Sequence, residues 1–259
     1  MMRSSRCFRA LLGLAAVGIL PAVLHGQQDP VPQRRSPRTE FERFSIGVRV
    51  GYQVTAQITE GTLDTTSTST NPATLFKDTS EPQQDNWGIG GGVQVNILPR
   101  WGITAELMAH SIRFKTGLRA DRRETATRPR QLLSNNFVVT EANHWDVPVT
   151  LRYYLNGPRQ RARPFISGGA AMRMVRNAKS TREIGDIDGG DSEFLNITPE
   201  VAADRTMGLV GGLGFELIDD INLKVSVEGR YMRWQEKTFE TGLANALRNH
   251  VEIMVGVSF

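Results

Sequence analysis

Strict alternation of side-chain character marks the stretch Val251-Glu252-Ile253-Met254-Val255-Gly256-Val257-Ser258-Phe259. Its odd-numbered residues are all valine, isoleucine or phenylalanine, whereas its even-numbered residues are mixed in character. Successive side chains of a β-strand point to opposite faces, so this period of two predicts a strand with one apolar face. Chain termini usually fray, but this strand keeps its pattern to the terminal aromatic residue. We therefore expect a strand that is held in a sheet along its whole length.

The same pattern of alternation recurs seven more times along the chain. Most of these segments have branched or aromatic side chains at every second position, with glycine or polar side chains between them. The segment 164–175 shows the pattern least clearly, with Ile166, Ala170, Met172 and Met174 on its apolar face. The predicted strands span residues 44–56, 87–97, 101–114, 144–155, 164–175, 207–217, 221–231 and 251–259. In the third of these the parity slips near Ser111, after which Ile112 and Phe114 join the apolar face. This slip predicts a β-bulge.

The connections between the predicted strands alternate in length. The short ones span 98–100, 156–163 and 218–220, and the long, polar ones span 57–86, 116–142, 177–205 and 235–248. A barrel with its turns at one rim and its loops at the other has this alternation, and membrane barrels of bacteria are built in this way. The sequence therefore predicts an all-β fold, an eight-stranded antiparallel up-and-down transmembrane β-barrel.

Three segments carry a family resemblance: Asp146 to Tyr154, Arg163 to Ala170, and the terminal Phe259. In these the chain resembles small bacterial outer-membrane β-barrels of the OmpA/OmpX type, the outer membrane protein β-barrel domain family. The resemblance covers 42–259. It implies an integral outer-membrane protein whose C-terminal Phe259 is read by the barrel assembly machinery. We further expect a monomer without a cofactor.

The N-terminal residues predict export. Arg3, Arg6 and Arg9 precede an apolar run from Ala10 to Leu24, which is too short for a membrane-spanning helix and is typical of a secretory signal peptide. We assign 1–26 to the signal peptide, 27–41 to a flexible periplasmic tail and 42–259 to the barrel domain. The single cysteine precedes the apolar run, so we expect no disulfide or thiolate site in the mature protein.

The net charge argues against nucleic acid as a partner. The formal charge of the chain is +4, and the three leader arginines account for three of these charges. A mature charge of +1 lacks the clustered basic excess that nucleic-acid binding requires.

Alternation alone does not say which face points outward, and a soluble, lipocalin-like ligand-binding barrel is the alternative. Aromatic residues near the strand ends of the apolar face favour the membrane, because such residues form girdles at the two interfaces. The predicted girdle consists of Trp87, Trp101, Trp145, Tyr153, Tyr231 and Phe259.

The opposite face then lines the lumen, and it carries five cations and five anions. The predicted ion-pair network consists of Arg49, Glu106, Asp146, Arg152, Arg173, Glu216, Lys224, Glu228, Arg230 and Glu252. Buried charges need partners, and eight strands leave a lumen that side chains can fill. We therefore expect a filled lumen rather than an open pore.

The candidates for chemistry are few. Imidazole and carboxylate groups can hold zinc or copper, and His110 and His144 are candidate ligands on neighbouring strands, although we expect ordinary rim histidines rather than a metal site. A lipid A-modifying outer-membrane enzyme is the alternative function, with His144 or His250 as the base, but neither is flanked by a nucleophile motif.

Arginines in the second long connection could bind lipopolysaccharide phosphates, since guanidinium groups bind phosphate bidentately. These are Arg119, Arg122, Arg123, Arg128 and Arg130. The favoured function is an outer-membrane barrel with a structural or surface-interaction role and four extracellular loops.

Overall fold

The computed structural model describes residues 43–67, 74–83, 86–122, 131–158, 160–185, 193–219, 223–241 and 244–259. They lie within one compact unit, Glu40–Phe259. The predicted signal peptide and periplasmic tail lie outside the described residues. Among the described residues, no helix is long and apolar enough to cross a membrane.

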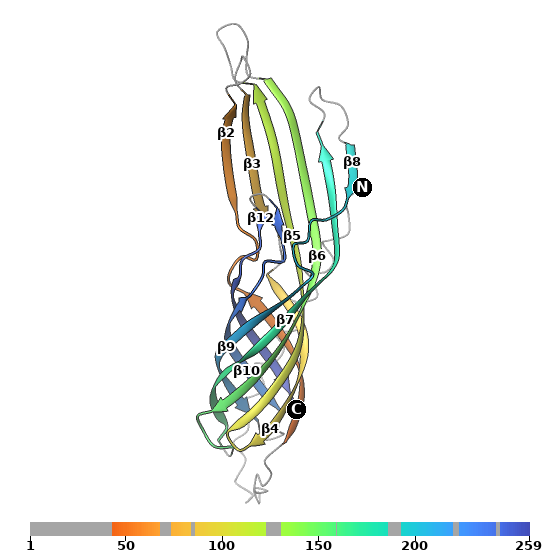
Figure 1. Ribbon diagram of the computed structural model, residues 1–259. Coiled ribbons are helices and arrows are strands. Elements are labelled where there is room, and N and C mark those ends of the chain that lie inside the picture. The colour runs from red at the N-terminus through yellow and green to blue at the C-terminus, as the bar shows by residue number, and fades with distance from the viewer. Residues whose placement is uncertain are drawn as a thin grey trace, which may run out of the picture. The chain divides into compact units, whose positions relative to one another are not determined.

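Eight antiparallel strands close into a barrel (Figure 1). The barrel strands are β1 (Phe44–Gln53), β4 (Trp87–Leu98), β5 (Trp101–Arg122), β6 (Gln131–Tyr154), β7 (Ala162–Ile184), β9 (Arg205–Ile218), β10 (Lys224–Trp234) and β13 (Asn249–Ser258). Each pairs with the next in this order, and β13 returns to pair with β1. The predicted eight-stranded up-and-down barrel is confirmed.

The terminal segment forms the closing seam. Val48 of β1 lies opposite Val257 of β13, and Tyr52 lies opposite Ile253. Beyond the last ladder residue, the Phe259 amide donates to the Ile46 oxygen at 3.0 Å and its oxygen accepts from the Ile46 amide at 2.9 Å. Closure leaves neither strand with a free edge, so every backbone group along the seam has a partner.

Parts of the connections expected at 57–86, 116–142 and 177–205 are themselves strands. Three of the barrel strands are therefore much longer than predicted. β5, β6 and β7 continue past the barrel, and three further strands pair beside them (Figure 1). These are β2 (Gly61–Ser67), β3 (Thr74–Pro82) and β8 (Glu193–Ile197). We call β2, β3, β8 and the outer parts of β5, β6 and β7 the projecting sheet. A small hairpin, β11 (Glu240–Thr241) with β12 (Ala244–Asn245), lies in the fourth long connection.

The bulge predicted near Ser111 is wrong. The register of β5 with β6 is unbroken from Trp101 to Ala120, and Met108, His110, Ile112 and Phe114 are all buried on one face. The apparent slip is a change in the lining of the lumen, from polar below Ile112 to apolar above it.

An irregularity does occur where β6 and β7 leave the barrel. Their register shifts between Glu141 and Asn143, and Asn177 on the longer side has a φ of 52°. An extra residue on one strand bends the pair and increases its twist, so this bulge accompanies the change from barrel wall to projecting sheet.

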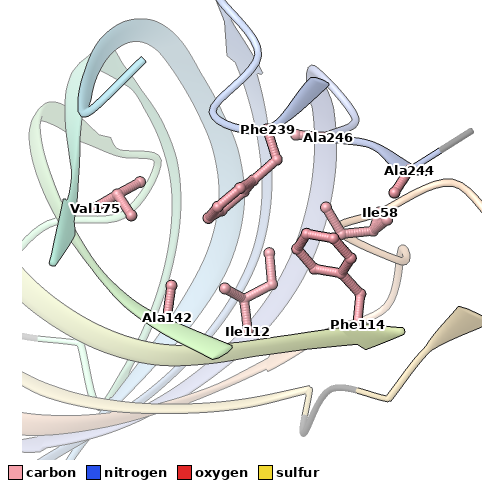
Figure 2. Close-up of a cluster of buried hydrophobic side chains, with 8 residues drawn as sticks. All are labelled: Ile58, Ile112, Phe114, Ala142, Val175, Phe239, Ala244 and Ala246. Atoms are coloured by element: carbon pink, nitrogen blue, oxygen red, sulfur yellow. The ribbon is translucent and has the colours of Figure 1, made fainter. Parts of the chain in front are cut away.

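Above the polar lumen lies a cluster of buried apolar side chains, which we call the apolar plug (Figure 2). Its members are Ile58, Ile112, Phe114, Ala142, Val175, Phe239, Ala244 and Ala246. Four come from barrel strands and four from connections, because the segments around Ile58, Phe239 and Ala244–Ala246 fold inward over the mouth of the barrel. The Phe114 and Phe239 rings meet edge to face, with centroids 5.4 Å apart.

Candidate functional site

The lumen is the most elaborate site in the described chain. All ten charged residues that the parity placed inside are buried there, and Arg152 and Glu252 are 0% and 1% exposed. Burial of this many charges costs several kcal/mol per ion unless each is paired and hydrogen-bonded. Their pairing therefore determines whether the barrel can fold.

Five of these residues form one central network. Glu106 lies 2.8 Å from Arg230, 3.1 Å from Arg49 and 3.5 Å from Arg152. Glu228 lies 2.5 Å from Arg152, 3.3 Å from Arg230 and 3.6 Å from Arg49. Three guanidinium groups thus share two carboxylates, contributed by strands on opposite walls of the barrel.

Polar side chains surround the central network. Ser167 donates to Glu228 at 2.8 Å, and Arg152 donates to the Gln94 oxygen at 3.2 Å. These bonds fix the side chains whose charges would otherwise be solvated by water, so the network is a rigid filling of the lumen.

A second group fills the turn end of the lumen. The Tyr154 hydroxyl donates to Glu216 at 3.1 Å and accepts from Gln94 at 2.8 Å. Arg163 lies 3.4 Å from Glu216 and stacks over the Tyr154 ring at 3.7 Å. Lys224 is buried at the same end, opposite Ile218 and Ser258 in the ladders.

A third group lies at the loop end, directly beneath the apolar plug. Arg173 donates to both oxygens of Asp146 at 2.8 Å, a bidentate pair, and stacks over Trp234 at 4.3 Å. The rings of His110 and His144 stack, with centroids 5.0 Å apart, as expected for opposite residues of β5 and β6. The Glu252 carboxylate lies 3.6 Å from His110.

The exterior of the barrel reverses the usual arrangement of a soluble protein. Apolar side chains from all eight strands are exposed, among them Leu213 at 70% and Leu209 at 69%. A continuous apolar exterior around a charged interior is stable only against lipid, and closure removes the strand edges that lipid would not tolerate. This chain is a small outer-membrane β-barrel. Its exterior excludes the lipocalin-like alternative.

The predicted girdle residues all lie on this lipid-facing surface. Tyr153 is half-buried, and the other five are exposed. Trp101 packs against Tyr153 at the turn end, with ring centroids 4.7 Å apart. Trp145 lies opposite Ala109, eight residues further along β5. This separation is about 27 Å along the strand, or about 20 Å for a tilted strand, close to the apolar band of such barrels.

Comparison with known proteins gives structural likeness alone. No protein-family model matches the sequence, and no curated protein matches it. The outer membrane protein OprG from Pseudomonas aeruginosa is 12% identical, over 83% of this chain and 95% of that chain, with a TM-score of 0.40. Ail of Yersinia pestis is 12% identical (85% and 100%; TM-score 0.34), and Neisserial surface protein A is 8% identical (83% and 95%; TM-score 0.32). The outer-membrane assignment rests on the exterior and the strand topology of this barrel itself.

Sequence reasoning missed several residues of the lumen. Arg163 lies one residue before the predicted strand 164–175, and carrying the parity back by one position would have placed it inside. Phe239 and Ile58 had no such signal, because connections that fold into a barrel mouth have no strand periodicity.

The remaining candidates fall in different places. His144 and His250 are buried inside, 2% and 0% exposed, so neither faces a lipid substrate as the lipid A-modifying alternative requires. Arg119 lies on the projecting sheet, with its side chain half exposed and 3.1 Å from Asp121. The side chain of Arg122, and the whole of Arg123, Arg128 and Arg130, lie outside the described residues.

Proposed function

We propose that this barrel is a non-conducting membrane anchor that presents the projecting sheet at the cell surface for contact with other molecules. The observation that carries the proposal is the closed mouth of the barrel, where the apolar plug covers a lumen already filled by ion pairs.

Backbone bonds reinforce the closure. The Thr59 amide donates to the Asn245 oxygen at 2.9 Å, and the Leu247 amide donates to the Gln57 oxygen at 2.8 Å. These bonds join the first and fourth long connections across the mouth. Ions would have to pass both an apolar layer and a network of paired charges, so steady conductance is not expected.

The projecting sheet offers a surface to partners. Its outer strands, β2 and β8, each pair on one side with a described strand. Leu63 on β2 and Phe194 on β8 are exposed at 50% and 64%. Exposed elements on a rigid scaffold commonly carry binding functions in such proteins, which favours recognition at this sheet over transport.

Lipopolysaccharide is a proposed partner, but we assign its contact to other arginines than those of the second long connection. Arg119 lies ten residues beyond Ala109 on β5, about 33 Å further along the strand. Arg205 and Arg233 are exposed much nearer the outer girdle. Arg205 lies opposite Met174, which itself lies opposite Trp145, and Arg233 follows two residues after Tyr231. Lipid phosphates lie at the membrane surface, so we favour these two arginines for that contact. The double variant Arg205→Gln/Arg233→Gln should copurify with less lipopolysaccharide, whereas Arg119→Gln should not.

The terminal Phe259 bears on how the barrel is assembled. The backbone of Phe259 closes the seam, but its side chain is 68% exposed and adds nothing to the interior. We therefore propose that this side chain serves recognition by the barrel assembly machinery. We further propose that the closed barrel works as a monomer.

Two measurements test the anchor function. In planar bilayers the purified barrel should show no steady conductance, and a stable, open-channel current would refute the proposal. An epitope tag inserted at 123–130 should bind antibody on intact cells, whereas the same tag in the turn between β6 and β7 should bind only after the outer membrane is opened. Labelling of the turn tag alone on intact cells would reverse the orientation and refute surface presentation.

A further inference from the structure

Beneath the apolar plug, two histidines and two carboxylates converge from three strands. His110 comes from β5, His144 and Asp146 from β6, and Glu252 from β13. β13 is not a neighbour of β5 or β6 in the barrel, so Glu252 reaches His110 across the narrow lumen. All four side chains are buried, with exposures of 1% or 2%.

Among the described residues, three atoms at this point have no hydrogen-bond partner. They are Nε2 of His110, Nε2 of His144 and Oε1 of Glu252. A buried polar atom without a partner costs free energy, and most native structures avoid it. His110 Nε2 and Glu252 Oε1 lie 3.6 Å apart, which is too far for a hydrogen bond. A ligand placed between the three side chains would satisfy all three atoms.

The third histidine of the group is different. Nε2 of His250 lies 2.8 Å from the Leu247 oxygen, and its Nδ1 lies 3.4 Å from Arg173. Both of its nitrogens are engaged, so His250 is not available to the same ligand.

We propose that His110, His144 and Asp146, with Glu252 as the fourth ligand, bind a divalent transition-metal ion, for which zinc is the best match. Imidazole nitrogens and carboxylate oxygens both bind zinc, which is commonly four-coordinate and tetrahedral in proteins. The ligand atoms of the first three residues all lie within 4.8 Å of one another.

The separations are close to those of a loaded site. His144 Nε2 lies 3.7 Å from Asp146 Oδ2, and His110 Nε2 lies 4.0 Å from the same oxygen and 3.6 Å from Glu252. Ligands about 2.1 Å from a tetrahedral ion lie about 3.4 Å apart, so these three pairs must close by about 0.2 to 0.6 Å. The two imidazole nitrogens lie within 4.8 Å of each other and must also approach. The imidazole planes are 11° apart, so one ring turns about its Cβ–Cγ bond to aim its lone pair at the ion.

Arg173 acts as the outer partner of the site. Its two bonds fix the Asp146 carboxylate, as hydrogen bonds to metal-bound carboxylates do elsewhere. Arg230 lies opposite Glu252 in the β10–β13 ladder. Two carboxylates therefore face two guanidinium groups, and the ion is held by its four ligand atoms rather than by a net negative charge.

The position of the site predicts how the ion enters. The apolar plug covers it on the loop side, and the central ion network fills the lumen below. The ion is therefore taken up during folding and exchanges slowly afterwards, and it joins β5 and β6 to β13 across the lumen.

The test is refolding of the full chain from urea into detergent, with zinc chloride or in metal-free buffer. After removal of free zinc with EDTA, the zinc content of the folded barrel is measured by mass spectrometry. About one zinc per barrel should be retained when zinc is present during folding, and far less when it is added later. His110→Gln/His144→Gln should lower retention at least tenfold, whereas the matched control His250→Gln should retain it.

Folding of each variant is checked by heat-modifiable gel mobility. A second measurement uses the unaltered chain: cobalt supplied during refolding should give the intense visible absorption of a tetrahedral site. Folded wild-type barrel without zinc and without this absorption would overturn the proposal. So would equal zinc retention by the folded double variant. Neither outcome bears on the conductance test of the anchor function.

Discussion

Removal of one lumen carboxylate should destabilise the barrel far more than removal of an exposed one. Glu228 lies within 3.6 Å of Arg49, Arg152 and Arg230, and all four side chains are almost completely buried. Glu228→Gln keeps the shape but leaves three guanidinium groups with one remaining carboxylate in the network. Breaking a buried pair from one side costs about 3–5 kcal/mol. At 3 kcal/mol, the folding equilibrium constant falls more than about 100-fold.

The matched control is an ion pair of similar length on the surface. Arg113 lies 3.1 Å from Glu141, with the two side chains 46% and 58% exposed. Because water and salt screen such pairs, Glu141→Gln should cost less than about 1 kcal/mol. The two variants therefore differ in burial rather than in chemistry.

The assay is equilibrium unfolding in urea from lipid vesicles, followed by tryptophan fluorescence and gel mobility. Equal destabilisation by Glu228→Gln and Glu141→Gln, or a loss below 1 kcal/mol for Glu228→Gln, would refute the buried network as the basis of stability. Arg152→Gln/Glu228→Gln should cost less than the sum of its single variants, since it removes opposite charges together.

Three further outcomes are expected. A Cβ at Gly169 would overlap the Val149 backbone, so Gly169→Ala should cost about 1–3 kcal/mol, whereas Gly168→Ala should be tolerated in the same unfolding assay because its nearest neighbour is 4.0 Å away. Phe239→Ala removes a ring from the apolar plug and should cost about 3–5 kcal/mol, with current fluctuations in planar bilayers; an unchanged stability would mean that the ring does not hold the mouth. Phe259→Ala should lower the amount of assembled barrel in cells yet leave stability after refolding in vitro nearly unchanged, and equal effects in both would contradict a recognition role.

Much of the barrel could be predicted from the sequence because each strand records its two environments locally. Leu213, Phe215 and Leu217 face lipid, while Glu216, between Phe215 and Leu217, faces the lumen. This difference in polarity between the two faces can be seen in any window of a few residues. The count of eight and the closing role of the terminal strand followed from the same signal. Element ends were predicted less well, since solvated strands such as β2 and β3 have no apolar face to produce alternation.

The lumen shows the limit of that reasoning. Parity correctly put Ile112 on the same strand as His110, but the change to an apolar side chain was taken for a bulge. In the barrel the alternation continues and the lining changes, because the connections carrying Ile58 and Phe239 fold over the mouth. The side-chain pattern of one strand does not show which distant segment of the chain will pack over it.

The sequence by itself determined the fold class, the exposure of the apolar face to lipid, and the set of charges that face inward. Side-chain alternation, from which these follow, is a property of each strand alone. Only the tertiary structure decided which of those charges meet. Glu252 reaches His110, and Arg152 reaches Glu228, from strands that are not neighbours. Their heights in the lumen depend on the register of every ladder around the closed barrel, and a single strand does not contain that information.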